Sequence, residues 1–136
     1  MQIDEMHALV GEARIGRLAT IDPDGRPNVV PFVYALASDT VHAVVDRKPK
    51  RTTALRRLEN LRRDPRAVIL VDHYSEDWEQ LWWVRMRGTA RVVDGGADLD
   101  RTCDLLRAKY EQYQDVEMDE IAILIDIEDW SGWKMR

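Results

Sequence analysis

Cysteine, histidine and long apolar runs are scarce in this sequence, and each shortage excludes a class of site. Cys103 is the single cysteine among 136 residues, which excludes an intramolecular disulfide and a metal centre built from several thiolates. The three histidines, His7, His42 and His73, are far apart and have no second ligand at metal-like spacing. No apolar stretch approaches the roughly 20 residues that a membrane-spanning helix needs. Because residues 1–7 also lack the basic and then apolar layout of a secretory signal, we expect a cytoplasmic protein without a metal site or a membrane span.

Recognisable catalytic motifs are also missing. Residues 11–16 have the glycine spacing of a phosphate-binding loop, but Arg17 and Leu18 follow where that motif has lysine and a hydroxyl residue. Ser38 and Ser75 have no ordered partners in the sequence, so nothing supports a hydrolase triad. A redox cofactor carries its own reactivity and leaves the protein to bind and orient it, so such a protein needs no conspicuous nucleophile or acid–base pair.

Positive charge, in contrast, is concentrated in one window of an acidic chain. Residues 47–66 contain nine basic and two acidic residues, although the whole chain has a net charge of −5. The other 116 positions hold 11 basic and 23 acidic residues, a net charge of −12. A general nucleic-acid binder draws on a broad basic surface, so this distribution argues against one and favours a local seat for an anion.

The pattern within this window predicts a helix whose first turn follows a cluster of cations. Apolar residues recur at three- and four-residue spacing from Ala54 to Leu61, until Asp64-Pro65 ends the helix. Thr52 or Thr53 is then the N-cap, and the unpaired N–H groups of a helix N-terminus favour an anion such as phosphate or carboxylate. The later arginines of the helix are expected to form a solvent-exposed face: Arg56, Arg57, Arg62 and Arg63.

The hydrophobic pattern predicts one domain, residues 1–136, in which strands follow one another with three helices interposed. Strands are expected at residues 15–21, 28–36, 40–46, 67–71, 83–93 and 121–127, and helices at 3–13, 53–63 and 99–113. The first three strands have connections of only a few residues, which excludes parallel α/β winding. We expect an α+β protein, mainly β: a six-stranded antiparallel barrel with helices plugging its ends.

The strand expected at 83–93 alternates most regularly. Val84 and Met86 begin an apolar face, whereas Trp83, Arg85 and Arg87 share the opposite face. Trp83 either lines a groove for a cofactor or substrate or packs in the core or a dimer contact. Arg85 and Arg87 either pair with acidic side chains or meet an anionic ligand.

Four segments, in order along the chain, carry a family resemblance: residues 15–31, 48–53, 61–71 and 83–90. They are similar to the opening hairpin, the basic loop, the helix end with its following strand, and the strand leading to Gly-x-Ala of the pyridoxamine 5′-phosphate oxidase-like (FMN-binding split barrel) superfamily. Together they span most of the chain. With the paired tryptophans at 82–83, the basic segment resembles the coenzyme F420-dependent oxidoreductase branch more than the vitamin oxidases.

This resemblance implies a split β-barrel with Greek-key topology that forms a homodimer. A flavin or deazaflavin then lies in a groove between the subunits, and its phosphate lies near the basic loop. The phosphate-binding segment corresponds to Lys48, Lys50, Arg51, Thr52 and Thr53, and the strand that faces the ring system to Asn28, Val29, Val30 and Pro31. The residue pattern adds Trp83 and Arg85 to this cofactor site.

The resemblance names no catalytic residue. Two extra helical turns between the basic loop and Asp64-Pro65 leave open which cation contacts the phosphate. Trp130 and Trp133, in a tail after the last strand, are expected in the dimer contact.

The cofactor and the activity remain open between three alternatives. The deazaflavin of coenzyme F420 has a phosphodiester and a polyglutamate tail, which several cations suit better than they suit compact FMN. The main expectation is therefore an F420-binding oxidoreductase that transfers hydride to a small organic molecule. The alternatives are an FMN-binding oxidoreductase and a non-catalytic carrier of a flavin or deazaflavin.

Overall fold

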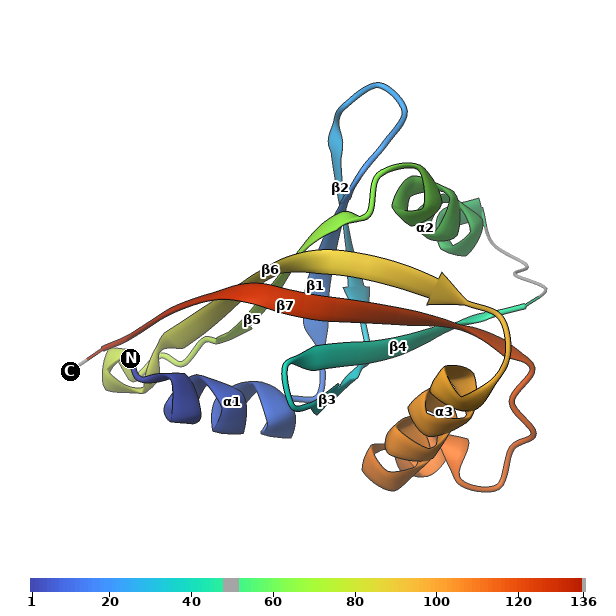
Figure 1. Cartoon of the computed structure of the whole chain (residues 1–136). Helices are drawn as coiled ribbons and strands as arrows, with labels where there is room; N and C mark the ends of the chain where they lie inside the picture. The colour runs from blue at the N-terminus through green and yellow to red at the C-terminus, as the bar shows by residue number, and fades with distance from the viewer. Residues whose placement is uncertain (48–51, 136) are drawn as a thin grey trace.

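The fold is that of a computed structural model, which describes residues 1–47 and 52–135 and, for residues 52–54, the backbone only. Seven strands and three α-helices follow in this order (Figure 1): α1 (Ile3–Glu12), β1 (Gly16–Ile21), β2 (Pro27–Phe32), β3 (Ala35–Ala37), β4 (Thr40–Asp46), α2 (Thr52–Arg63), β5 (Arg66–His73), β6 (Trp82–Val93), α3 (Ala97–Lys109) and β7 (Glu120–Lys134). None of these helices, in the part of the chain that the structure describes, is long and apolar enough to cross a membrane.

The strands form one antiparallel sheet in the order β2-β1-β5-β6-β7-β4-β3. β5, β6 and β7 are successive neighbours, and β4, which reaches β5 through α2, lies beside β7. This is a Greek-key arrangement. The expected α+β class and antiparallel pairing are therefore confirmed.

The prediction of six strands is wrong, because the stretch expected as one strand at 28–36 is two strands on opposite edges of the sheet. β2 pairs with β1 and β3 pairs with β4. Tyr34 lies at the break: its N–H donates to the Tyr110 hydroxyl (3.3 Å), and its carbonyl accepts from Tyr110 Oη (3.0 Å) and Lys109 Nζ (3.0 Å). Side chains of α3 thus satisfy the backbone groups that a continuous strand would give to a neighbour.

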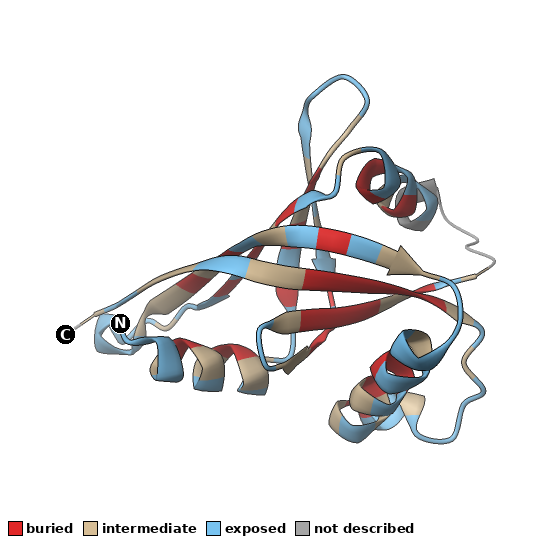
Figure 2. Ribbon diagram, in the orientation of Figure 1, coloured by how far each residue is buried: buried red, intermediate tan, exposed pale blue. Residues whose placement is uncertain are grey.

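The core lies inside the curved sheet (Figure 2), and two of the three helices close it. Met6 and Val10 of α1 and Leu58 and Leu61 of α2 are buried with the inward side chains of six strands. α3 packs outside, where Leu106 and Tyr110 form a second cluster with Ala35. The expectation that helices plug the barrel is therefore correct for α1 and α2 and wrong for α3.

β7 is longer than expected, since the presumed tail at 130–133 continues the strand. The register of β6 and β7 shifts at Gly88, which lies opposite Ile127, whereas Arg87 lies opposite Asp129. A Cβ atom at Gly88 would lie within 2.3 Å of the Asp126 carbonyl oxygen, so only glycine fits this approach. The extra residue of this bulge, Glu128, reverses the alternation of β7 beyond it.

Candidate functional site

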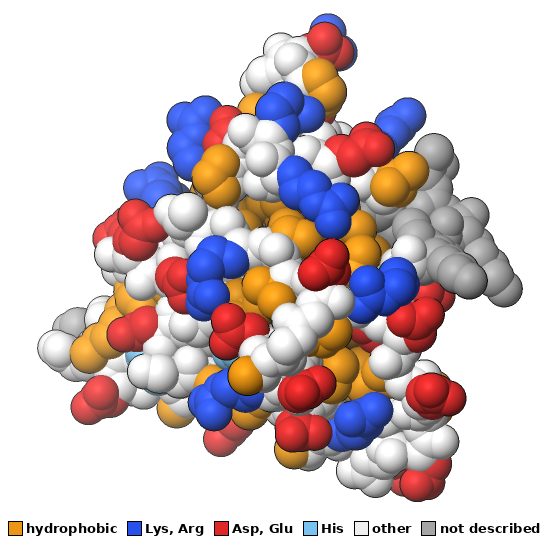
Figure 3. Space-filling model, turned by 45° about the vertical axis from the view of Figure 1, so that its right-hand side comes forward, with side chains coloured by type: hydrophobic (Ala, Val, Ile, Leu, Met, Phe, Trp, Pro, Cys, Tyr) orange, Lys and Arg blue, Asp and Glu red, His pale blue; other side chains and the backbone are white. Residues whose placement is uncertain are grey.

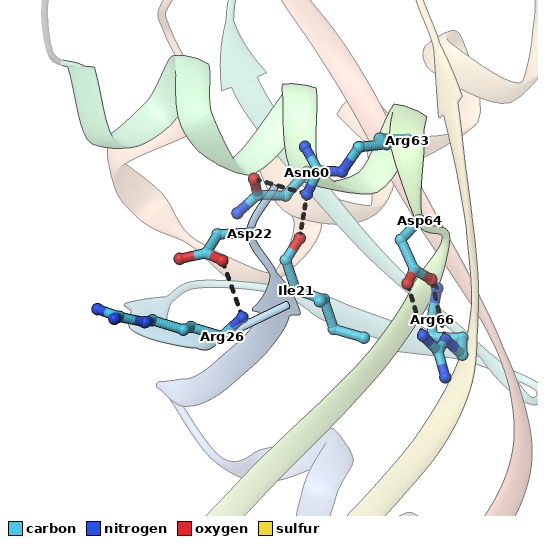
Figure 4. Close-up of polar contacts among 7 residues, drawn as sticks. All are labelled: Ile21, Asp22, Arg26, Asn60, Arg63, Asp64 and Arg66. Carbon is cyan, nitrogen blue, oxygen red and sulfur yellow. Dashed lines mark hydrogen bonds and ion pairs between the residues drawn. The ribbon is translucent and has the colours of Figure 1, made fainter. Parts of the chain in front are cut away.

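A small pocket lies where α2 crosses the β1–β2 hairpin. Its volume is about 220 Å³, and its walls are Thr20, Asn28, Val30, Arg56, Arg57 and Asn60. Asn60 is buried and donates to Thr20 Oγ1 (3.1 Å). Arg63 donates to the Ile21 carbonyl, as Figure 4 shows. These two bonds hold α2 over the hairpin, so we call this space the helix pocket.

The side chain that bears most on ligand binding in the helix pocket is Arg57. Its Nε atom is buried and has no hydrogen-bond partner among the described residues. Burial lowers the pKa of the Arg57 guanidinium, because desolvation penalises its charged form. A half-buried cation of this kind is stabilised by an anion that accepts its N–H groups. The expectation that Arg57 belongs to a solvent-exposed face is therefore wrong.

The sequence held a signal for Arg57 that the motif reading missed. Arg57 is three residues after Ala54 and four before Leu61, so it borders the apolar stripe of the helix. Asn60 lies on the same side and was missed as well. Both side chains point toward the hairpin because Leu58 and Leu61, on the neighbouring positions, are buried in the core.

Part of the basic segment lies outside the described residues. This holds for Lys48, Lys50 and Arg51. α2 begins at Thr52, so Thr52 and Thr53 lie at its N-terminal end, and the expectation that one of them is the N-cap stays a prediction. Figure 3 shows basic side chains over the hairpin and α2, whereas acidic side chains are frequent over α3.

A second, larger space lies on the outer face of the sheet, across β2, β1, β5 and β6. This outer groove has a volume of about 520 Å³ and is lined by Arg17, Ala19, Val29, Val68, Leu70, Asp72, Trp83 and Arg85. The strand register brings these side chains together, because Arg17 pairs with Leu70, and Leu70 pairs with Arg85. Three residues predicted for the cofactor site, Val29, Trp83 and Arg85, meet here.

β2 separates the two spaces. Asn28 and Val30 face the helix pocket, and Val29 faces the outer groove. Pro31 is exposed on the same strand face as Val29 and lies opposite Arg17. β2 pairs only with β1 among the described strands, so its other edge presents unpaired backbone groups. A flat ligand with an anionic tail can lie along this edge and reach both spaces.

The histidines take no part in either space. His7 bonds to Asp39 (2.9 Å), His42 is buried against Thr102 (2.7 Å), and His73 stacks with Trp82. Within the described ranges, no group of three or more His, Cys, Asp or Glu side chains could hold a metal ion.

Comparison with known proteins identifies the family. The model of the family described as pyridoxamine 5′-phosphate oxidase matches residues 3–134, so the chain belongs to this family. Three solved structures share the fold. A conserved hypothetical protein of Mycobacterium tuberculosis is 24% identical (TM-score 0.82; 98% of this chain and 85% of that chain covered). A FAD-binding protein of Mesorhizobium loti is 23% identical (TM-score 0.73; 97% and 92%), and an F420 reductase is 19% identical (TM-score 0.66; 92% and 94%).

The same fold also occurs in proteins with another named ligand. The heme storage protein HutZ of Vibrio cholerae is 15% identical, with a TM-score of 0.71, and the match covers 97% of this chain and 93% of that chain. At these identities the likeness to solved structures concerns the fold, and the ligand has to be argued from the site.

Proposed function

We propose that this chain binds coenzyme F420 along the free edge of β2 and transfers hydride between it and a small organic molecule, in a groove between two subunits. The observation that carries the proposal is Arg57, which lines the helix pocket and whose buried Nε has no hydrogen-bond partner among the described residues. A pocket of this size accepts a phosphate group, and its α2 residues Arg56 and Arg57 lie in the N-terminal half of that helix, toward the positive end of the helix dipole. Membership of a family named for a flavin-dependent oxidase supports a cofactor of this type.

The number of cations favours the deazaflavin over FMN. Arg56 and Arg57 flank the helix pocket, and residues 47–66 hold nine basic residues in all. One compact phosphate needs few of them, whereas a phosphodiester with a polyglutamate tail engages several. FMN remains the second candidate, because the helix pocket of about 220 Å³ holds its single phosphate.

Haem fits the described spaces less well. Its iron needs an axial ligand such as His, Cys, Met or Tyr. None of these residue types lines the helix pocket or the outer groove as the structure describes them. The site therefore supports a flavin-type ring and an anionic tail better than an iron porphyrin.

When bound, the cofactor supplies the hydride chemistry. The chain's own residues have simpler tasks. Arg57 holds the anionic part, the β2 edge orients the ring, and Val29 and Val68 exclude water from the outer groove beside the ring. A carrier without catalytic activity would keep the first two tasks, so turnover with unsaturated or carbonyl-bearing compounds has to be measured as well as binding.

The test is a binding titration of the purified protein with F420 and with FMN. Arg57→Met should weaken binding of the true cofactor about tenfold to a hundredfold, since a hydrogen bond to a charged group contributes ~1.5–3 kcal/mol. Arg62→Met removes an exposed arginine from the same helix and is the control. Equal affinity of both variants and the wild type would contradict an anion at Arg57. Tighter binding of FMN than of F420 would select the second candidate.

A further inference from the structure

The arginines of the outer groove differ from the other arginines on this face of the sheet in their ion pairing. Elsewhere on this face the arginines have carboxylate partners: Arg66 with Asp64 (2.7 Å), Arg87 with Asp129 (3.7 Å) and Arg91 with Asp126 (2.8 Å). In the described part of the chain, no ion pair joins Arg17 or Arg85 to a carboxylate, although Asp72 also lines the groove. The groove therefore holds two cations against one acid.

Arg85 is held in a defined position beside a flat ring. Its Cζ atom lies 5.7 Å from the centroid of the Trp83 ring. This contact restricts the side chain without using its N–H groups. The Nε atom of Arg85 is buried and has no hydrogen-bond partner among the described residues. An anion that reached it would gain a charge-assisted hydrogen bond in a partly dry site.

The remaining walls of the outer groove are apolar. Val29 of β2 and Val68 and Leu70 of β5 stand on the same face, on either side of β1, and Val29 is 62% exposed. Apolar walls, an indole ring and one fixed guanidinium suit a planar ring system that bears a negative charge. A volume of about 520 Å³ is enough for a molecule of two fused rings.

We propose that the outer groove is the substrate site and that it selects planar aromatic carboxylates, with Arg85 binding the carboxylate and Trp83 supporting the ring. The proposal rests on the function proposed above, in which the cofactor lies along β2. It places the substrate on the Val29 side of that strand and the cofactor's anion on the Asn28 side. Arg85 then determines specificity, and Arg57 determines cofactor affinity.

The test uses a matched pair of probes, 2-naphthoate and its neutral amide 2-naphthamide, with calorimetry on the full-length protein. The wild type should bind the carboxylate at least tenfold more tightly than the amide. Arg85→Met should abolish this preference. Trp83→Leu should lower the affinity for both probes by a similar factor. Arg87→Met, two residues along the same strand face and paired with Asp129, is the control and should keep the preference.

A second titration separates this proposal from the proposed function. Protein saturated with F420 should still bind 2-naphthoate, and Arg57→Met should leave naphthoate binding unchanged. Displacement of naphthoate by the cofactor would show that the ring fills the outer groove, which would overturn the substrate assignment. Equal binding of acid and amide, or no binding of either, would also overturn it. Failure of F420 to bind, with naphthoate preference intact, would reject only the cofactor.

Discussion

Two side chains with buried polar atoms, Arg57 and His42, show that one such residue can serve binding and another stability. Arg57 has an N–H group without a partner in the described chain, beside a pocket. His42 shares a hydrogen bond with Thr102 and is buried between β4 and α3, away from either groove. Because buried polar groups are normally paired, the unpaired one indicates a ligand and the paired one indicates structure.

His42 should make stability depend on pH. Burial is the main cause that lowers its pKa, and the nearby Arg101 adds to it. The unfolded chain therefore binds the proton first as the pH falls below the ordinary value of about 6.5, and the free energy of unfolding declines until folded His42 is protonated too. Urea unfolding at pH 7.5 and 5.5 measures this loss.

The contribution of His42 to this loss of stability is measured by comparing variants with the wild type. His42→Gln should lose less stability between the two pH values than the wild type does. His73→Gln removes an exposed imidazole and should behave as the wild type. An equal loss in all three proteins would show that carboxylates alone govern the pH dependence.

Among the elements, β6 and β7 meet at a bulge that decides which side chains of β7 face the core. The bulge at Glu128 turns Trp130 toward the core, where its ring stacks on His7 at 4.4 Å between centroids. It also places Trp133 directly opposite Trp83 on the outer face. Without the extra residue, the alternation of β7 would exchange these two tryptophans.

Gly88 should be intolerant of a side chain, because the bulge brings the Asp126 carbonyl to the position of a Cβ atom. We expect Gly88→Ala to lower the free energy of unfolding by about 1–3 kcal/mol, as overpacking does in well-packed interiors. Gly11→Ala in α1, where a Cβ meets nothing within 4 Å, is the control and should be neutral or slightly stabilising. Urea unfolding compares the two, and equal stability would contradict the close approach.

For the molecule as a whole, the exposed apolar residues on the outer face support the proposed homodimer. Val29, Leu70 and Trp133 are 62%, 38% and 42% exposed. An apolar face of this kind is often covered by another chain. The groove of about 520 Å³ on this face would then be walled in part by the second subunit.

Light scattering after size exclusion should therefore give about twice the 15.8 kDa of one chain. Trp133→Glu should shift the mass toward the monomer, because a charge in a buried contact is destabilising. Val116→Glu, on an exposed residue between α3 and β7, should leave the mass unchanged. A wild-type protein of 15.8 kDa at every concentration would reject the dimer.

Local patterns were enough to predict the class of the fold and most of its elements. The alternation of β6 and the helical spacing in α2 each depend on residues close in sequence, and the structure has both. The family resemblance depended on the same segments, and the family is confirmed. The basic window marked α2 as the element of interest, although its cations at 48, 50 and 51 lie outside the described residues.

Tertiary contacts decided what the local patterns left open. The break at Tyr34 depends on Tyr110 and Lys109, more than 70 residues away in sequence. The bulge at Glu128 depends on how β6 approaches β7, and the burial of Arg57 depends on the hairpin beneath α2. Composition and periodicity report how each segment prefers to fold, whereas an unpartnered group or a groove exists only once distant segments have packed together.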